Sequence, residues 1–181
     1  STPDVSLRKW LGRNGLVTKE RGGDVMVDAL ASADIMAQMR RGAIVGAWLP
    51  EPWATRIAIE LNATRLVDER ELWAEHRFPT ALVVVRRPFY EARRAETDSV
   101  VRTIHDQIAR AKTDPTIRES AFAEIKRLTG KGLPKPVMDA SWERLDFTTD
   151  PIPSALAQMA VDACALGYVP RADVRGLVGE V

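Results

Sequence analysis

One apolar segment near the middle of the chain sets the strongest limit on its fold. Phe78–Val85 (FPTALVVV) is the longest run with the composition of a strand. A strand this apolar is buried on both faces and requires neighbouring strands, because an edge strand of this kind invites aggregation. After Val85, however, the chain shows only amphipathic stretches with helical spacing. The second half is therefore expected to cover a sheet whose strands lie upstream of Ser1.

The first half of the chain alternates between the helical and the strand pattern. Predicted helices span Ser1–Gly15, with Thr2 as N-cap and Pro3 as first helical residue, Ala33–Arg41, and the stretch from Pro52 through Leu61. Predicted strands are Asp24–Leu30, Ala43–Trp48, Thr64–Asp68 and Phe78–Val85. Such alternation with short connections is typical of a parallel or mixed α/β sheet.

The second half of the chain contains five predicted helices. Each begins near a Pro, Asp, Ser or Thr, which are residues that favour helix starts. The predicted helices are Pro88–Arg94, Thr97–Lys112, Pro115–Thr129, Pro134–Arg144 and Ser154–Leu166. Several carry an apolar stripe, and two end at a glycine, as helices commonly do.

Charge balance and composition exclude several classes of protein. The 181 residues include 26 Lys or Arg and 25 Asp or Glu, so the net charge of +1 supplies no long-range field for nucleic acid. No stretch approaches the roughly 18 uninterrupted apolar residues of a membrane helix. The single cysteine, Cys164, excludes an internal disulfide and a Cys-based zinc cluster. We therefore expect no nucleic-acid partner and no metal site.

The start of the first helix is the first candidate binding site. Ser1, Thr2 and Asp4 lie where the free backbone N–H groups and the positive end of the helix dipole favour an anion. The hydroxyl groups of Ser1 and Thr2 add neutral hydrogen-bond donors. The simpler interpretation is an ordinary N-cap without a ligand.

A second candidate follows the predicted strand Ala43–Trp48. Trp48, Glu51 and Trp53 come directly after its end, and ligands of open α/β sheets bind at the carboxyl ends of strands. The alternative is that both tryptophans pack in the core, while Glu51 balances the dipole of the following helix.

Groups suited to catalysis are few. His76 lies in a polar loop and His105 in the middle of a helix, where both are expected at the surface. Cys164 lies on an apolar helix and is expected to pack as a small hydrophobic residue. The sequence shows no nucleophile–base pattern and no Gly-rich phosphate loop, so we expect no catalytic residues and no cofactor.

Several segments resemble the nitrate/sulfonate/taurine-type substrate-binding proteins of ABC transporters. The resemblance begins at the stretch that opens the second lobe in that family and continues in the same order and with similar spacing. The segments that carry it are Thr2–Leu11 (TPDVSLRKWL), Asn14–Leu16, Gly23–Val25, Gly46–Ala54 (GAWLPEPWA), Leu66–Glu69 and the close from Asp150 to Val169. The Gly46–Ala54 block is the most specific of them.

The resemblance implies a type II periplasmic-binding-protein-like two-lobed α/β fold. Residues 1–80 would form one complete α/β lobe. Residues 81–181 would supply the return strand and the C-terminal helices of the other lobe, whose N-terminal part would be absent from this chain. A missing N-terminal segment of the same protein is accordingly an expected partner.

The resemblance also implies the function and its residues. It predicts capture of a small anionic or zwitterionic ligand, such as an alkanesulfonate, taurine or nitrate, for an ABC transporter permease. The matching site residues are Ser1, Thr2, Asp4, Trp48, Glu51 and Thr80. We further predict that Trp53 joins Trp48 in the apolar wall of the site. The expected location is periplasmic, or extracellular and membrane-anchored as a lipoprotein. The alternatives are an enzyme on the same fold, which would need His76 or His105 in the cleft, and a ligand-sensing domain.

Overall fold

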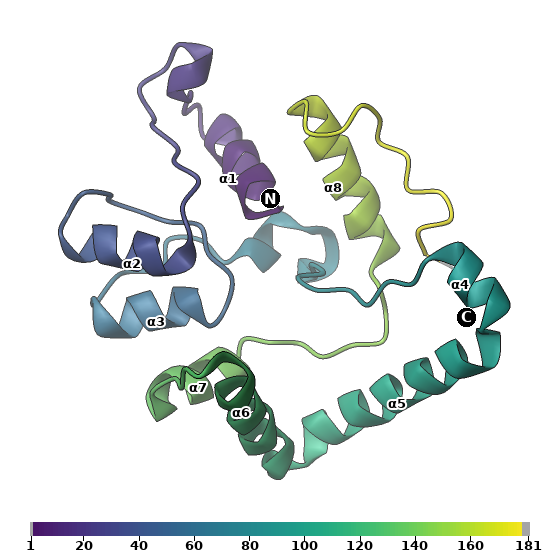
Figure 1. The fold of residues 1–181 in the computed structure, drawn as a ribbon. Coiled ribbons are helices and arrows are strands. Elements are labelled where there is room, and N and C mark those ends of the chain that lie inside the picture. The colour runs from purple at the N-terminus through teal and green to yellow at the C-terminus, as the bar shows by residue number, and fades with distance from the viewer. Residues whose placement is uncertain (1, 179–181) are drawn as a thin grey trace. The chain divides into compact units, whose positions relative to one another are not determined.

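The computed structural model describes residues 2–178, in which all regular secondary structure is helical (Figure 1). The α-helices of this part of the chain are α1 (Thr2–Arg13), α2 (Ser32–Arg40), α3 (Trp53–Glu60), α4 (Arg87–Ala92), α5 (Arg94–Thr113), α6 (Pro115–Thr129), α7 (Lys135–Trp142) and α8 (Pro153–Ala165). Short 3-10 turns are η1 (Lys19–Arg21), η2 (Glu69–Leu72) and η3 (Ala74–His76). Every helix predicted from the sequence is present, with ends shifted by at most a few residues.

Helix α6 illustrates why the helices form where the sequence indicates. The Asp114 side chain accepts a hydrogen bond from the Thr116 N–H at 2.9 Å, and Pro115 occupies the first helical position. The helix ends at Gly130, whose φ of 68° is the left-handed conformation that stops helices. Both signals act within a few residues of the helix end.

The expectation of an α/β fold with one complete α/β lobe is wrong. Within residues 2–178, the only β pairing is an isolated parallel bridge between Thr18 and Val25. The four predicted strands, including Phe78–Val85 with the expected return strand, are irregular chain without a sheet. Their apolar side chains are not buried on two faces, since Leu66 is 84% exposed and Val83 75% exposed.

The physical reason lies in strand pairing. A strand is stable only when its backbone N–H and C=O groups bond to those of a neighbour. The apolar composition of Ala43–Trp48 suits a buried strand, but composition does not supply the neighbouring strand that its backbone needs. In this structure the surrounding elements are helices and loops that pack through side chains, so the type II two-lobed arrangement does not form.

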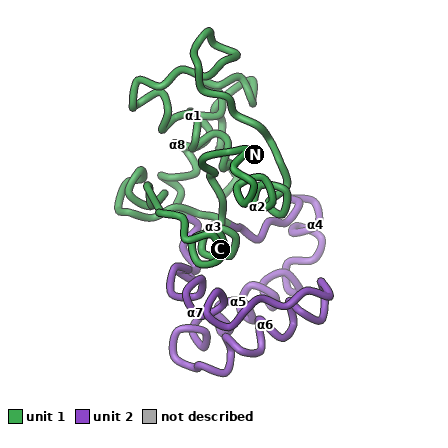
Figure 2. The backbone as a smooth tube through the Cα atoms, turned by 90° about the vertical axis from the view of Figure 1, so that its left-hand side faces the viewer, with its two compact units in different colours: residues 1–80, 152–181 green, residues 81–151 purple. Residues whose placement is uncertain are grey.

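The chain divides into two compact units, coloured separately in Figure 2. Unit 1 combines residues 1–80 with residues 152–181, and α1 packs beside α8 within it (Figure 1). The Lys9 ammonium lies 2.7 Å from the Asp162 carboxylate, which pairs α1 with α8 through a buried acidic group. The buried apolar residues of this unit are Val5, Leu11, Met36, Ile57, Ile152, Ala155 and Leu156.

Unit 2 comprises residues 81–151 and contains α4 to α7. Its interior is centred on α7, where Val137 and Ser141 are buried. The Trp142 ring lies 5.9 Å from the Phe122 ring and 4.8 Å from the Phe147 ring, measured between centroids. An aromatic cluster of this kind stabilises a small helical unit by burying large side chains.

Candidate ligand-binding site

Trp48 is held against helix α1 by two interactions. Its indole Nε1 donates a hydrogen bond of 2.8 Å to Oε2 of Glu69. Its ring lies 6.2 Å from the Trp10 ring of α1, with 51° between the ring planes. Glu69 also accepts a hydrogen bond from the buried Ser6 hydroxyl of α1. The predicted binding residue Trp48 therefore lies beside α1, although its own segment is irregular chain.

The carboxylate of Glu51 is occupied on both oxygens. Oε2 accepts a hydrogen bond of 3.1 Å from the backbone N–H of Thr55 in the first turn of α3. Oε1 lies 3.0 Å from the Arg65 guanidinium, which also donates to the Thr55 hydroxyl at 3.3 Å. Only 11% of the Glu51 side chain is exposed, so its negative charge is largely offset by Arg65.

Trp53 is half-buried at the first position of α3. The guanidinium of Arg56, one turn further along, lies 5.3 Å above its ring in a cation–π contact. The same arginine donates to Glu60 at 2.7 Å. Trp53 thus interacts with a positive charge of its own helix and leaves part of its ring accessible.

The start of α1 is tied to the C-terminal part of unit 1. Asp4 accepts hydrogen bonds from the Arg8 Nε at 3.1 Å and from the Tyr168 hydroxyl. The bond to Asp4, together with burial, raises the pKa of the Tyr168 hydroxyl above its ordinary value. Thr2 is exposed at the first position of α1, whereas Asp4 is half-buried. Ser1, the remaining candidate at this helix start, lies outside the described residues.

Comparison with models of known protein families gives a match for this chain. The model of the NMT1-like family matches residues 1–125, which is more than half of the sequence. The chain belongs to the NMT1-like family. This confirms the resemblance to nitrate/sulfonate/taurine-type binding proteins, and it indicates a periplasmic or extracellular binding protein that binds a small ligand and works with an ABC system. Comparison with curated proteins and with solved structures returned no match.

In the NMT1-like chain the predicted site residues belong to separate contacts, and the network of Trp48, Trp10, Glu69 and Ser6 includes one of them. Trp48 joins α1 through Trp10 and Glu69, whereas Glu51 interacts with Thr55 and Arg65. Thr80 is exposed at the end of the first segment of unit 1. Sequence reasoning missed Glu69 as the residue that holds Trp48. The only available signal was its place in the Leu66–Glu69 block that resembles the family.

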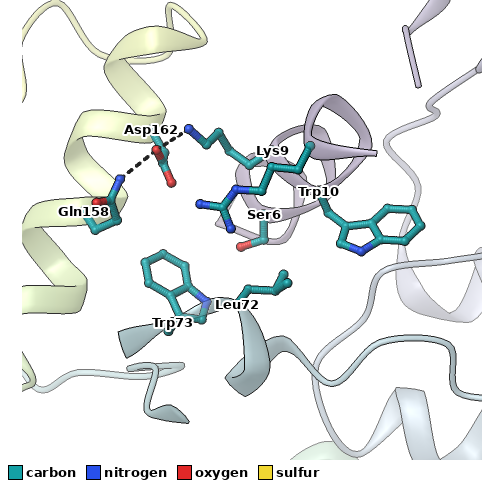
Figure 3. A pocket seen from close by; sticks show the side chains of 8 residues that line it. Ser6, Lys9, Trp10, Leu72, Trp73, Gln158 and Asp162 are labelled. Atoms are coloured by element: carbon teal, nitrogen blue, oxygen red, sulfur yellow. Dashed lines mark hydrogen bonds and ion pairs between the residues drawn. The ribbon is translucent and has the colours of Figure 1, made fainter. Parts of the chain in front are cut away.

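Figure 3 shows a pocket of the NMT1-like chain next to this network, between α1, α8 and the η2–η3 segment. Its lining consists of Ser6, Lys9, Trp10, Arg13, Leu72, Trp73, Gln158 and Asp162. The interior holds about 20 Å³, which is room for one water molecule and too little for a sulfonate. Asp162 is satisfied there by Lys9 at 2.7 Å and by the Gln158 amide at 3.0 Å.

The two histidines of the NMT1-like chain, which are the candidates for acid–base chemistry, lie at the surface. His76 is exposed in η3 and His105 is exposed on α5. Within residues 2–178, no three His, Cys, Asp or Glu side chains gather as metal ligands. Over the same residues, no helix combines the length and apolar composition needed to cross a bilayer.

Proposed function

We propose that this chain binds a small anionic or zwitterionic ligand, with an alkanesulfonate or taurine preferred over nitrate, and delivers it to the permease of an ABC importer. The observation that carries the proposal is the family match over residues 1–125. That match includes the α1 start and the Trp48–Trp53 block, which are the two candidate regions of the sequence. The protein would act in the periplasm, or outside the cell as a membrane-anchored lipoprotein.

The pairing of the acidic side chains in the predicted site is compatible with an acidic ligand. Two carboxylates of the predicted site, Asp4 and Glu51, would repel an anion if they were bare. Asp4 is bonded to Arg8 and Tyr168, and Glu51 to Arg65, so both negative charges are offset within the protein. Thr2 is exposed at the start of α1, so its hydroxyl and the positive end of the helix dipole are available to an oxyanion.

The apolar part of the ligand would lie on the tryptophans. Trp48 and Trp53 are both half-buried, so each presents part of a large flat surface. An alkanesulfonate or taurine has a hydrocarbon segment that gains from such a surface, whereas nitrate has none. Thr80 supplies a further exposed hydroxyl for a polar group of the ligand.

A binding role is preferred to an enzymatic one. A histidine enzyme on this sequence would use His76 or His105 as its acid or base. Both residues are exposed, and His105 belongs to unit 2 whereas the candidate site belongs to unit 1. We propose that the ligand is bound and released without a chemical step and without a cofactor.

Isothermal titration calorimetry with taurine, ethanesulfonate and nitrate tests this proposal. We expect the two sulfonates to bind, and Thr2→Ala and Trp48→Ala each to weaken binding about tenfold, the effect of about 1.4 kcal/mol from one lost polar or aromatic contact. Thr103→Ala, an exposed threonine of α5, is the control and retains full affinity. Unchanged affinity in both site variants would remove the residue assignments. The absence of binding by all three compounds would overturn the function.

A further inference from the structure

The carboxylate of Glu69 connects three segments of unit 1 that are distant in sequence. Oε1 accepts from the Ser6 hydroxyl on α1, 63 positions away. Oε2 accepts from the Trp48 indole at 2.8 Å, 21 positions away. Glu69 itself opens η2 and is half-buried. Each oxygen thus binds a different segment, and the carboxylate acts as a bridge between them.

Trp48 depends on this bridge because its own backbone is not part of a helix or strand. Residues 43–50 are irregular chain, and the nearby Val45 is fully exposed. The orientation of the indole therefore rests on two side-chain contacts, the bond to Glu69 and the ring contact with Trp10. A hydrogen bond weakens steeply when it departs from a straight line, so the bond to Glu69 is the more directional contact.

The neighbouring residue keeps Glu69 available for this role. Asp68 caps η2 by accepting from the backbone N–H of Arg70 at 3.1 Å. The Glu69 side chain is therefore not needed as a cap for its own turn. Ser6 is buried on α1 and anchors the other oxygen to a long helix. The Glu69 carboxylate thereby fixes the Trp48 ring relative to Ser6 on α1.

We infer that Glu69 is a positioning residue whose carboxylate sets the Trp48 indole against Trp10 and so shapes the aromatic wall for a sulfonate's hydrocarbon part. The second half of this inference rests on the proposed function. The first half concerns the protein without ligand. Glu69 touches Trp48 and Ser6, and its effect on the ligand passes through the tryptophan.

The chemistry of the bridge predicts which substitutions preserve it. The indole Nε1 only donates, whereas a serine hydroxyl both donates and accepts. In Glu69→Gln the amide oxygen accepts from Trp48, and the amide N–H₂ donates to Ser6, so both contacts survive. Glu69→Ala removes both contacts. Glu69→Asp keeps the charge but is one methylene shorter, so it does not span Ser6 and Trp48 together.

The test combines circular dichroism without ligand and calorimetry with taurine. Two indoles 6.2 Å apart and tilted by 51° couple electronically, and this coupling gives a paired band that Trp48→Phe also removes. We expect Glu69→Ala and Glu69→Asp to lose the band and about tenfold in taurine affinity. Glu69→Gln and the control Glu71→Ala, an exposed residue of the same turn, retain both.

The outcomes separate this inference from the proposed function. The helical signal shows whether Glu69→Ala folds. If it does not fold, Glu69→Asp is compared with Glu69→Gln by the circular-dichroism band and the taurine affinity, and this comparison tests the positioning role. A band that persists in Glu69→Ala or in a folded Glu69→Asp overturns the positioning role, whatever the binding data show. A band lost as expected, in a protein that binds neither taurine nor ethanesulfonate, supports the positioning of Trp48 and overturns the ligand-binding half together with the proposed function.

Discussion

Asp4 and Tyr168 lie 164 positions apart in the sequence and are joined by a hydrogen bond in unit 1. Asp4 also pairs with Arg8 on the next turn of α1 at 3.1 Å. The carboxylate favours the protonated phenol as its donor, so the pKa of Tyr168 is raised above its ordinary value. A raised pKa in the folded state means that the contact stabilises the fold below the unfolded pKa of tyrosine. This stability is lost as the pH rises through the folded pKa.

This contact predicts a late ionisation of Tyr168, because its pKa is raised by the hydrogen bond to Asp4. The chain has two tyrosines, Tyr90 and Tyr168, and absorbance at 295 nm follows the ionisation of both. We expect one ionisation at a higher pH than ordinary tyrosine, and we expect Tyr168→Phe to remove it. Tyr90→Phe is the control, because Tyr90 faces the Arg94 guanidinium at 5.1 Å in the other unit. A late ionisation that persists in Tyr168→Phe would contradict the assigned contact.

Residues of the candidate site differ in how far the sequence revealed them. Trp48 and Glu51 stand out locally, because large aromatic and acidic residues follow an apolar run at a proline turn. The role of Glu69 does not stand out, since its two partners lie 63 and 21 positions away. No local pattern encodes a hydrogen bond across such separations. The sequence indicates which residues have functional side chains, and the fold determines which of these side chains come into contact.

At the scale of elements, helices were predictable and strands were not. The start and end signals of α6, Asp114 with Pro115 and then Gly130, act on adjacent residues and need no other part of the chain. The apolar run Ala43–Trp48 indicates burial, but a strand also requires a paired neighbour. Within the described residues that pairing is limited to the Thr18–Val25 bridge. Extended segments such as Leu82–Val85 therefore keep exposed apolar side chains.

The helices predict opposite effects for one substitution at two glycines. Gly12 lies in α1 with open space around it, so Gly12→Ala gains helix propensity and raises the free energy of unfolding by about 0.5–1 kcal/mol. Gly130 ends α6 with a positive φ, so Gly130→Ala forces a left-handed alanine and lowers stability by about 1 kcal/mol.

Urea denaturation followed by the helical signal at 222 nm measures both glycine variants. At both positions, apart from the neighbouring residues and the helix's own backbone, no atom lies within 4 Å of the added methyl group, so a clash with other parts of the protein does not contribute to either value. The comparison therefore isolates backbone conformation. A stabilising Gly130→Ala or a destabilising Gly12→Ala would contradict the helix boundaries described here.

At the scale of the whole molecule, the candidate site and most of the tryptophans belong to unit 1. Unit 1 contains Trp10, Trp48, Trp53 and Trp73, whereas unit 2 contains Trp142. Two segments far apart in sequence build unit 1, and the Lys9–Asp162 and Asp4–Tyr168 contacts tie α1 to the C-terminal segment. The start of α1 is therefore held by the same unit that positions Trp48.

The distribution of tryptophans allows a direct measurement of where the ligand binds. Fluorescence of the 181-residue chain is recorded during titration with ethanesulfonate, and the titration is repeated with Trp48→Phe and Trp142→Phe. We predict a saturable change with the same midpoint in the unsubstituted chain and in Trp142→Phe. In Trp48→Phe we predict a smaller change with its midpoint at a higher ethanesulfonate concentration, because one contact is lost while Trp53 remains. A change of unaltered size and midpoint in Trp48→Phe, or no saturable change in the unsubstituted chain, would contradict sulfonate binding at Trp48.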